Sequence, residues 1–418
     1  MTKQKIILGI FAFLVLLILG CGGGGGGNNT SGLSQTNPSS PTPTPSTLSI
    51  STDSDAYVVG QNIILTWSGV NLTNCSISGD YTSTSSPMSG STSILASSSG
   101  EKIFNLSCTE KNVSVSVKVL DKSISIPDPI FADALTRLGY PVVNGKISGS
   151  DILKIKGFII WGRNNNYYGL PDSNNISVFT NTSVPDYNVK VAYVNDYIKD
   201  FTGLESMLNL ETFRIEHMNI STIDISQLKK LKFFSLWGNP IEFIDLSKNI
   251  NLSNVGLSET LIKSIDLSKL VKLEEIVLDS KKDTGMKVID FSNNSNLKRV
   301  YVSMNLKSII FPINNSIQEL WIGGNSFEVL DLSGMKNLTY IILTNSKELT
   351  DLNIKGVAYG GVPFRLYTTG SPKLLQIKVT SVQAIQEKIA SIIASTPAGQ
   401  EPALGLYWDP WTNLVNAP

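Results

Sequence analysis

The most regular feature of the chain is an apolar pattern, Leu-x-x-apolar-x-apolar, which returns about every 21 residues over its second half. Its first positions are spaced 20, 21 or 24 residues apart and are Leu210, Leu231, Leu252, Leu273, Leu297, Ile317 and Leu338. A further copy begins at Leu374, after a long excursion through Gly356–Ser371. The alternating apolar positions within each copy predict one short β-strand per repeat.

Each repeat also has a regular second half, Ile-Asp-Leu-Ser or a close variant, at residues 223–226, 244–247, 265–268, 289–292 and 330–333. Eight residues after the first apolar position come Asn239, Asn305 and Asn325, where an amide can satisfy the backbone groups of a turn. The recurring aspartates, such as Asp224 and Asp245, are interpreted as turn caps. A column of metal-ion sites is less favoured, because one carboxylate per turn rarely provides the several oxygen ligands that a cation such as Ca²⁺ needs.

A single repeat of this kind cannot bury its own apolar ridge. Repeats therefore stack side by side into a parallel coil with one continuous core. One side of each strand points into that core, and the alternate residues face solvent. The sequence thus predicts a mainly β solenoid of eight strands, whose solvent-facing side chains form columns across a concave sheet.

The repeat resembles the leucine-rich repeat, and its Ile-Asp-Leu-Ser half is similar to a subtype common in bacterial surface proteins. The resemblance covers roughly residues 198–379. It implies a curved leucine-rich-repeat domain over residues 122–418, with a parallel sheet and helical caps. Within this domain we expect an N-terminal cap at 126–145, repeats at 150–380 and a C-terminal cap at 381–418.

Helical patterns lie at both ends of the predicted solenoid. Residues 126–129, Ile-Pro-Asp-Pro, lead into an amphipathic segment at 130–140 that Gly139 ends. The apolar face of this segment consists of Phe131, Leu135 and Leu138. It resembles the Pro-Asp-x-x-Phe cap of the same repeat family. Residues 382–393 also have an amphipathic helical pattern, and we expect this helix to shield the last coil together with Tyr407, Trp408 and Trp411.

The first five residues include two lysines, Lys3 and Lys5, and a mostly aliphatic run follows at 6–19. Together with the small residue Gly20 these are the parts of a bacterial secretory signal. Its end, Ile-Leu-Gly-Cys, resembles the lipobox, which implies a signal over residues 1–21 and a lipidated Cys21. The alternative is a cleaved signal with an incidental cysteine. Residues 22–46 lack charge and are rich in Gly, Ser, Thr and Pro, which predicts a disordered tether. By analogy with lipoproteins we expect a cell-envelope location, in the outer membrane, with membrane attachment through the lipid only.

Residues 47–121 contain short alternating runs, such as 113–119, separated by Ser, Gly and Asn turns. This pattern predicts a small β-sandwich. The order Trp67, Cys75 and Cys108 resembles bacterial immunoglobulin-like modules of surface proteins. The resemblance implies a disulfide between the two cysteines, with the tryptophan packed nearby, in a domain that acts as a spacer.

Composition narrows the function further. The chain has 34 Lys and Arg residues and 34 Asp and Glu residues, so its formal net charge is zero. A protein without net positive charge does not attract nucleic acid electrostatically, and we expect no nucleic-acid partner. The chain has three cysteines and one histidine, His217. Zinc sites and Ser-His or Cys-His catalysis depend on these residue types. We therefore expect no catalytic, metal or cofactor site and no enzyme activity, and His217 is not interpreted as catalytic.

The columns of the predicted sheet give a candidate binding surface. A larger patch joins aromatic and charged side chains of adjacent strands, namely Arg299, Tyr301, Glu319, Trp321, Tyr340 and Ile342. A smaller patch nearer the N-terminus consists of Phe233 and Trp237. Exposed aromatic residues beside an arginine are typical of interface hot spots. The alternative is cross-strand stacking that only stiffens the sheet.

These features favour a lipid-anchored envelope protein that binds another protein, or a surface glycan, through its concave face. The chain resembles internalins in part. However, in internalins the immunoglobulin-like domain follows the repeats, whereas here it precedes them, which weakens the case for host-cell adhesion. A structural envelope or spacer protein is the second interpretation, and an enzyme is the third. One repeat scaffold supports many specificities, so the repeats predict a binding role and not a particular partner.

Overall fold

The computed structural model describes residues 45–162, 177–179, 189–280, 282–313, 316–357, 365–387, 406–408 and 413–416. Three sequence predictions therefore lie outside the described residues: the signal at 1–21 with Cys21, nearly all of the tether, and Trp411. Residues 382–387 of the predicted C-terminal helix are helical, and the rest of that segment is outside the described part.

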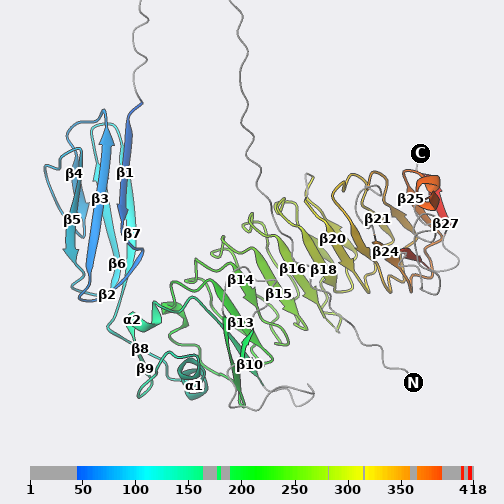
Figure 1. Cartoon of the computed structure of the whole chain (residues 1–418), viewed down its shortest axis with the longest axis horizontal. Helices are drawn as coiled ribbons and strands as arrows, with labels where there is room; N and C mark the ends of the chain where they lie inside the picture. Colours follow the sequence, from blue (N-terminus) through cyan, green and yellow to red (C-terminus); the bar gives the residue numbers. More distant parts are fainter. Residues whose placement is uncertain are drawn as a thin grey trace, which may run out of the picture.

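The N-terminal domain is a β-sandwich of two sheets (Figure 1). One sheet has the antiparallel order β1 (Thr47–Thr52), β3 (Asn62–Val70), β5 (Ser89–Leu95). The other has the order β2 (Ala56–Val58), β7 (Asn112–Leu120), β6 (Gly100–Ser107), β4 (Ser76–Gly79). Alternate residues of β3 and β6 are buried between the sheets, which is why the period-two pattern of the sequence forms strands here.

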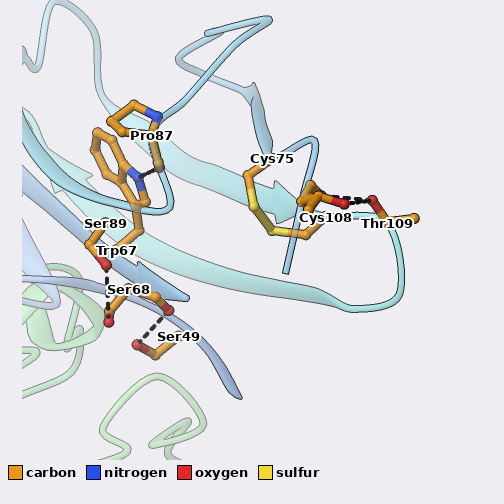
Figure 2. Close-up of a disulfide and its surroundings, with 9 residues drawn as sticks. Ser49, Trp67, Ser68, Cys75, Pro87, Ser89, Cys108 and Thr109 are labelled. Carbon is orange, nitrogen blue, oxygen red and sulfur yellow. Dashed lines mark hydrogen bonds between the residues drawn. A yellow bond between two sulfur atoms is a disulfide. The ribbon is translucent and has the colours of Figure 1, made fainter. Parts of the chain in front are cut away.

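The predicted disulfide between Cys75 and Cys108 is confirmed (Figure 2). Both cysteines belong to the same buried cluster as Trp67, as the sequence predicts. The Trp67 indole N–H donates to the carbonyl of Pro87 at 2.9 Å, so the polar atom of this core side chain is satisfied. A Cβ at Gly90 would lie 2.6 Å from the indole ring, and the absence of a side chain there gives the ring its space.

A short cap connects the sandwich to the solenoid. It consists of the antiparallel pair β8 (Ser123–Ser125) and β9 (Lys146–Ser148), with helices α1 (Pro129–Arg137) and α2 (Gly149–Ile152). Asp128 caps α1 by accepting hydrogen bonds from the backbone N–H groups of Ile130 and Phe131 at 2.9 Å. Its second oxygen accepts from the backbone of Lys199 at 2.9 Å, which ties the helix to the first coils.

The solenoid is built on one twelve-stranded sheet in which every neighbouring pair is parallel except β11 and β12 (Figure 1). Its order is β11 (Ser177–Phe179), β12 (Val189–Val194), β10 (Gly157–Gly162), β13 (Thr212–Glu216), β14 (Phe233–Ser235), β15 (Asn254–Ser258), β16 (Glu275–Asp279), β18 (Arg299–Ser303), β20 (Glu319–Ile322), β22 (Tyr340–Ile342), β24 (Arg365–Thr368) and β26 (Leu406–Trp408). We call this the main sheet. Strands β13 to β22 fall on the seven repeats read from the sequence, in register with one another.

The second halves of the coils form smaller parallel sheets. One pairs β17 (Val288–Asp290) with β19 (Ser308–Ile310). The other has the order β21 (Val329–Asp331), β23 (Asp351–Asn353), β25 (Gln376–Val379), β27 (Asn413–Asn416). One 3-10 turn, Leu204–Ser206, precedes β13. A single apolar cluster fills the space inside the coils and runs from Leu120 to Ile385, so the stacked repeats share one core.

The prediction that the copy beginning at Leu374 forms the eighth strand of the main sheet is wrong. Residues 374–379 do not extend the main sheet: Gln376 pairs with Asp351 of the second sheet, and β24 supplies the main-sheet strand of that coil. The reason is that the spacing Leu-x-x-apolar-x-apolar also fits the second half of the preceding coil, which starts at Leu349. Further along, β26 extends the main sheet and β27 extends the second sheet, so Leu406–Trp408 and Asn413–Asn416 contribute another pair of strands.

A buried polar residue follows five of the main-sheet strands at the turn that the sequence pattern marks. The position is occupied by Asn239, Thr260, Asn325, Ser346 and Ser371, all at most 1% exposed. Asn305 was predicted to play the same role and does not. It is half-buried, adopts a left-handed backbone with φ of 56°, and donates its amide to Asp283 at 2.8 Å. The shorter spacing of the repeat that follows, 20 residues, accompanies this change.

The recurring aspartates cap turns, as the sequence predicts. Each accepts a hydrogen bond from the backbone N–H of the serine two residues later, at 2.7–2.8 Å, and the five are Asp224, Asp245, Asp266, Asp290 and Asp331. This hydrogen bond is the main cause that lowers the pKa of Asp245 and Asp266 below the ordinary value of 3.8. The pKa values of Asp224 and Asp290 are lowered for the same reason.

The shifted aspartates predict a pH dependence of stability. A carboxyl with a lowered pKa in the folded state stabilises the fold above its unfolded pKa, and loses that contribution as pH falls through the folded value. We expect the free energy of unfolding to decline as pH falls below about 3.8. Urea titrations at pH 5 and pH 3 measure this. Replacing Asp224, Asp245, Asp266 and Asp290 with asparagine should reduce the difference, and an unchanged difference would contradict the assignment.

Candidate binding surface

The main sheet has one side in the core and one side toward solvent. In β16 and β18 the exposure alternates strictly, so that Glu275, Val277 and Asp279 are half-exposed whereas Ile276 and Leu278 are buried. Parallel pairing aligns equivalent positions of neighbouring coils, for example Glu275 with Arg299. We call the solvent-facing side chains of the main sheet the sheet face. It corresponds to the surface that the sequence predicts to be concave.

The centre of the larger predicted patch is a pair of rings on adjacent strands. Tyr301 and Trp321 are register partners, and their ring centroids lie 6.1 Å apart with planes inclined by 60°. The Tyr301 hydroxyl donates a hydrogen bond to Glu319 Oε2 at 2.8 Å. Burial, reinforced by this hydrogen bond, raises the pKa of Tyr301 above its ordinary value, so the hydroxyl remains a donor at neutral pH. Trp321 is 46% exposed, which leaves much of its ring available for contact.

Charged side chains border these rings on one side. Arg299 donates through Nε and one Nη to Glu275 Oε2, at 2.8 and 2.6 Å. Glu319 is the register partner of Arg299 on the next strand, so three charged residues follow one another across β16, β18 and β20. The structure thus brings together Arg299, Tyr301, Glu319 and Trp321 as the sequence predicts.

The far end of the predicted patch differs from expectation. Ile342 was predicted to be exposed but is only 8% exposed. Its register partners are Trp321 on one side and Tyr367 on the other, and two large rings leave little of a short aliphatic side chain accessible. Tyr367 was not predicted, because its strand lies within the excursion that the repeat pattern skips. Its ring packs edge-to-face against Tyr340, with centroids 6.1 Å apart.

A hollow of about 420 Å³ lies on the sheet face beside the two rings. It is lined by Ser258, Val277, Leu278, Asp279, Tyr301, Val302, Ser303 and Trp321. Small serine side chains on β15 and β18 stand next to the large rings, and this difference in size creates the depression. The sequence places Ser258, Val277, Asp279 and Ser303 in the predicted columns but gives no signal that they enclose a space.

The smaller predicted patch is part of a packed cluster. The Phe233 ring lies under the Arg214 guanidinium, 5.3 Å from its centroid. The Trp237 ring packs against His217 at 5.3 Å and against Trp161 at 6.3 Å. Phe233 and Trp237 are both half-buried, and neither lines the hollow.

A buried ion pair accompanies this cluster. Glu216, the register partner of Trp161, is fully buried, and Arg214 Nε donates to it at 2.8 Å. His217, at the end of the same strand, stacks on Trp161 and adopts a left-handed φ of 54°. These contacts favour the alternative given above for the smaller patch, in which cross-strand packing stiffens the sheet.

Metal-binding groups and membrane-spanning helices are the other features that bear on function. Within them, no group of three or more His, Cys, Asp or Glu side chains is arranged to hold a metal ion. The described helices include none that is both long and apolar enough to cross a membrane.

Similarity to known proteins is found at the level of structure. No family model matches the chain, and no curated protein matches it. Among solved structures, the chain is similar to the functional domain of InlJ from Listeria monocytogenes, whose description includes a cysteine ladder. The identity is 14%, the match covers 62% of this chain and 76% of that one, and the TM-score is 0.36. The repeats, the parallel main sheet and the continuous core show a solenoid of stacked coils.

Proposed function

We propose that this chain binds another protein through its sheet face, and that the contact is centred on Tyr301, Trp321 and the hollow beside them. The observation that carries the proposal is the 46% exposure of Trp321, whereas the other aromatic side chains of the main sheet whose burial is described are buried or half-buried. Tryptophan, tyrosine and arginine dominate the energetic centres of protein interfaces. The role is one of recognition and not of catalysis.

The solenoid geometry suits such a role. Parallel coils hold Arg299, Tyr301, Glu319 and Trp321 on rigid adjacent strands, with backbone hydrogen bonds on both sides of each strand. Side chains fixed in this way lose little conformational freedom on binding, so more of the interaction energy appears as affinity.

The remaining parts of the proposal concern how the solenoid is presented. We propose that Cys21 is lipidated, that residues 22–46 form a tether, and that the protein resides in the cell envelope, in the outer membrane. The lipobox-like end of the aliphatic N-terminal run supports this. We further propose that the β-sandwich is an immunoglobulin-like spacer. The position of Trp67 in the core with the Cys75–Cys108 disulfide supports that assignment.

Site-specific photo-crosslinking in the cells that produce the protein tests the binding role. p-Benzoylphenylalanine is introduced at position 321 on the sheet face, or at position 243 as the matched control. Phe243 is 60% exposed, lies outside the main sheet, and is also aromatic. We expect a discrete adduct with a second protein from position 321 and none from position 243.

Two results would contradict the proposal. Equal adducts from both positions would show contact without preference for the sheet face. The absence of any protein adduct at position 321, in cells that contain the folded protein, would remove the case for a protein partner. Carbohydrate attached at position 321, detected by mass spectrometry, would indicate a surface glycan in its place.

A further inference from the structure

One edge strand of the β-sandwich has no neighbour on its outer side in the part of the chain that the structure describes. Strand β5 pairs with β3 and ends its sheet. It lies at the border of the sandwich, on the side away from the solenoid (Figure 1). Its seven residues keep a continuous register with β3, without a bulge. A sheet edge of this kind presents a row of unpaired backbone N–H and C=O groups.

The hydrogen-bond pattern of the sheet shows which backbone groups of β5 point outward. The Asp53 N–H donates to the carbonyl of Ile64 at 3.2 Å, so even-numbered residues of β3 bond to β1 and odd-numbered ones bond to β5. The Ala96 N–H donates to the carbonyl of Gln61 at 2.9 Å, in agreement with this alternation. The backbone groups that face away from β3 are therefore those of Ser89, Ser91, Ser93 and Leu95.

The edge at β5 also lacks the usual protection against pairing with another chain. Native proteins protect edges with charged residues, proline, very short strands or a covering segment. Strand β4 is covered, because Ile77 exchanges two backbone hydrogen bonds at 2.9 Å with Ser83 of the loop that follows. Strand β2 has three residues, all buried, and β1 runs beside β7. Strand β5 contains neither proline nor a charged residue, and the whole segment from Tyr81 to Gly100 is uncharged.

We propose that β5 pairs with β5 of a second copy of this chain in antiparallel orientation, so that two three-stranded sheets join into one. Full overlap of the two strands places Thr92 on a two-fold axis, with Ser91 opposite Ser93. In this register the outward backbone groups of one copy meet those of the other, as antiparallel pairing requires. The inference goes beyond the proposed function, because it concerns the sandwich and not the sheet face.

Charge favours a second copy as the occupant of this edge. Pairing of a strand with itself brings each charge close to an identical one, and like charges opposite each other destabilise a strand pair. Strand β5 has no charge to repel its copy. Most of its side chains are Ser or Thr, whose hydroxyl groups form hydrogen bonds across strand pairs. Two-fold dimers are also the commonest protein oligomers.

The length of chain before the sandwich is compatible with this dimer. Antiparallel pairing places the two copies of Thr47, where β1 begins, at opposite ends of the joined sheet. The longest strand of that sheet, β3, has nine residues and is roughly 30 Å long. Residues 22–46 are long enough to reach roughly 80 Å. Two lipid-anchored copies can therefore attach to the same membrane.

Disulfide trapping of the full chain, in the cells that produce it, tests the pairing. Thr92→Cys places a thiol on the two-fold axis, at a pair of residues that share no backbone hydrogen bond and whose Cα atoms lie about 4.5 Å apart. A disulfide spans this distance. We expect a covalent dimer after mild oxidation with copper phenanthroline, seen by electrophoresis without reductant and lost when reductant is added.

The matched control is Ser114→Cys. Ser114 is an exposed serine of the same domain, but it lies on β7, an inner strand between β2 and β6. We expect no dimer from this variant above the level of the unmodified chain.

A charge or a proline at the edge should prevent the pairing. Ser93 is exposed, and Ser93→Lys combined with Thr92→Cys brings two ammonium groups close together across the axis. We expect the dimer yield to fall about tenfold or more. Ser91→Pro removes an outward N–H group without removing a hydrogen bond to β3, and it should lower the yield as well. Ser114→Lys adds the same charge on the inner strand and should leave the yield unchanged.

Several results would overturn the inference: no dimer from folded Thr92→Cys, an equal yield from Ser114→Cys, or an unchanged yield with Ser93→Lys. A covalent adduct of Thr92→Cys with a different protein would assign the edge to another partner and would overturn it too. None of these results affects the adduct at position 321, which tests the proposed function separately.

Discussion

Asn239→Ala is expected to lower the free energy of unfolding by about 4–5 kcal/mol, at the upper end for a single substitution. The Asn239 side chain is fully buried between two coils. Its oxygen accepts hydrogen bonds from the backbone N–H groups of Met218 and Ile220, at 2.9 and 3.1 Å. Its amide donates to the carbonyls of Ile215 and Leu236, at 2.8 and 3.0 Å. Alanine leaves these buried backbone groups without the partner that satisfies them.

Thr260→Ala provides the matched control, because Thr260 occupies the same position one coil further on. It is equally buried but makes one hydrogen bond, to the carbonyl of Leu257 at 2.8 Å. We expect a loss of about 1–2 kcal/mol there. Urea unfolding of both variants measures the difference. Equal losses would mean that the hydrogen bonds from Asn239 to the preceding coil do not stabilise the fold.

Removal of the disulfide by Cys75→Ala with Cys108→Ala is expected to destabilise the β-sandwich by about 3–4 kcal/mol. The two cysteines are 33 residues apart, and the bond restricts a loop of this length in the unfolded chain. The core of the sandwich is a buried cluster separate from that of the solenoid. The effect should therefore be confined to residues 47–121.

Hydrogen exchange resolves the two domains in one experiment. Amides of β3, β6 and β7 should exchange faster in the double variant, whereas those of β13 to β20 should keep their protection. A reducing agent added to the unmodified protein should reproduce the same pattern. Faster exchange throughout the solenoid would show that the two cores unfold as one unit.

The central coils were the part of the fold that the sequence predicted best. The core of one coil contains Leu231, Phe234 and Leu236. The spacing that places these three residues on one side also determines where the strand lies, its register and which side is exposed. The same logic holds from β13 to β22, where one pattern repeats without a long insertion.

Prediction failed where one pattern serves two structures. The Leu374 copy has the apolar spacing of a main-sheet strand but lies in the second sheet, and its coil obtains the main-sheet strand from Arg365–Thr368. Both halves of a coil bury alternate residues, so periodicity alone does not tell them apart. Asn305 shows a related limit, because it holds the same position in the repeat as the buried Asn239 and Asn325 but is half-buried and donates to Asp283.

The candidate site was predicted in its parts and not in its shape. Column positions identified Tyr301 and Trp321 as neighbours, because register follows from the repeat. The hollow depends on the contrast between the rings and Ser258 and Ser303 on other coils, which is a property of the assembled surface. Burial of Ile342 likewise depends on Tyr367, a residue of a strand that the pattern did not identify.

The most direct test of the binding role measures the affinity of the protein crosslinked at position 321 for the unmodified chain and for Tyr301→Ala with Trp321→Ala. Trp321 and Tyr301 both lie on the solvent-facing side of the main sheet and neither belongs to the buried core of the solenoid, so the folded state should persist. We predict a rise in Kd of about thirtyfold or more, since a hot-spot residue contributes at least about 2 kcal/mol. An unchanged Kd for a variant with unaltered unfolding would contradict the sheet face as the recognition surface.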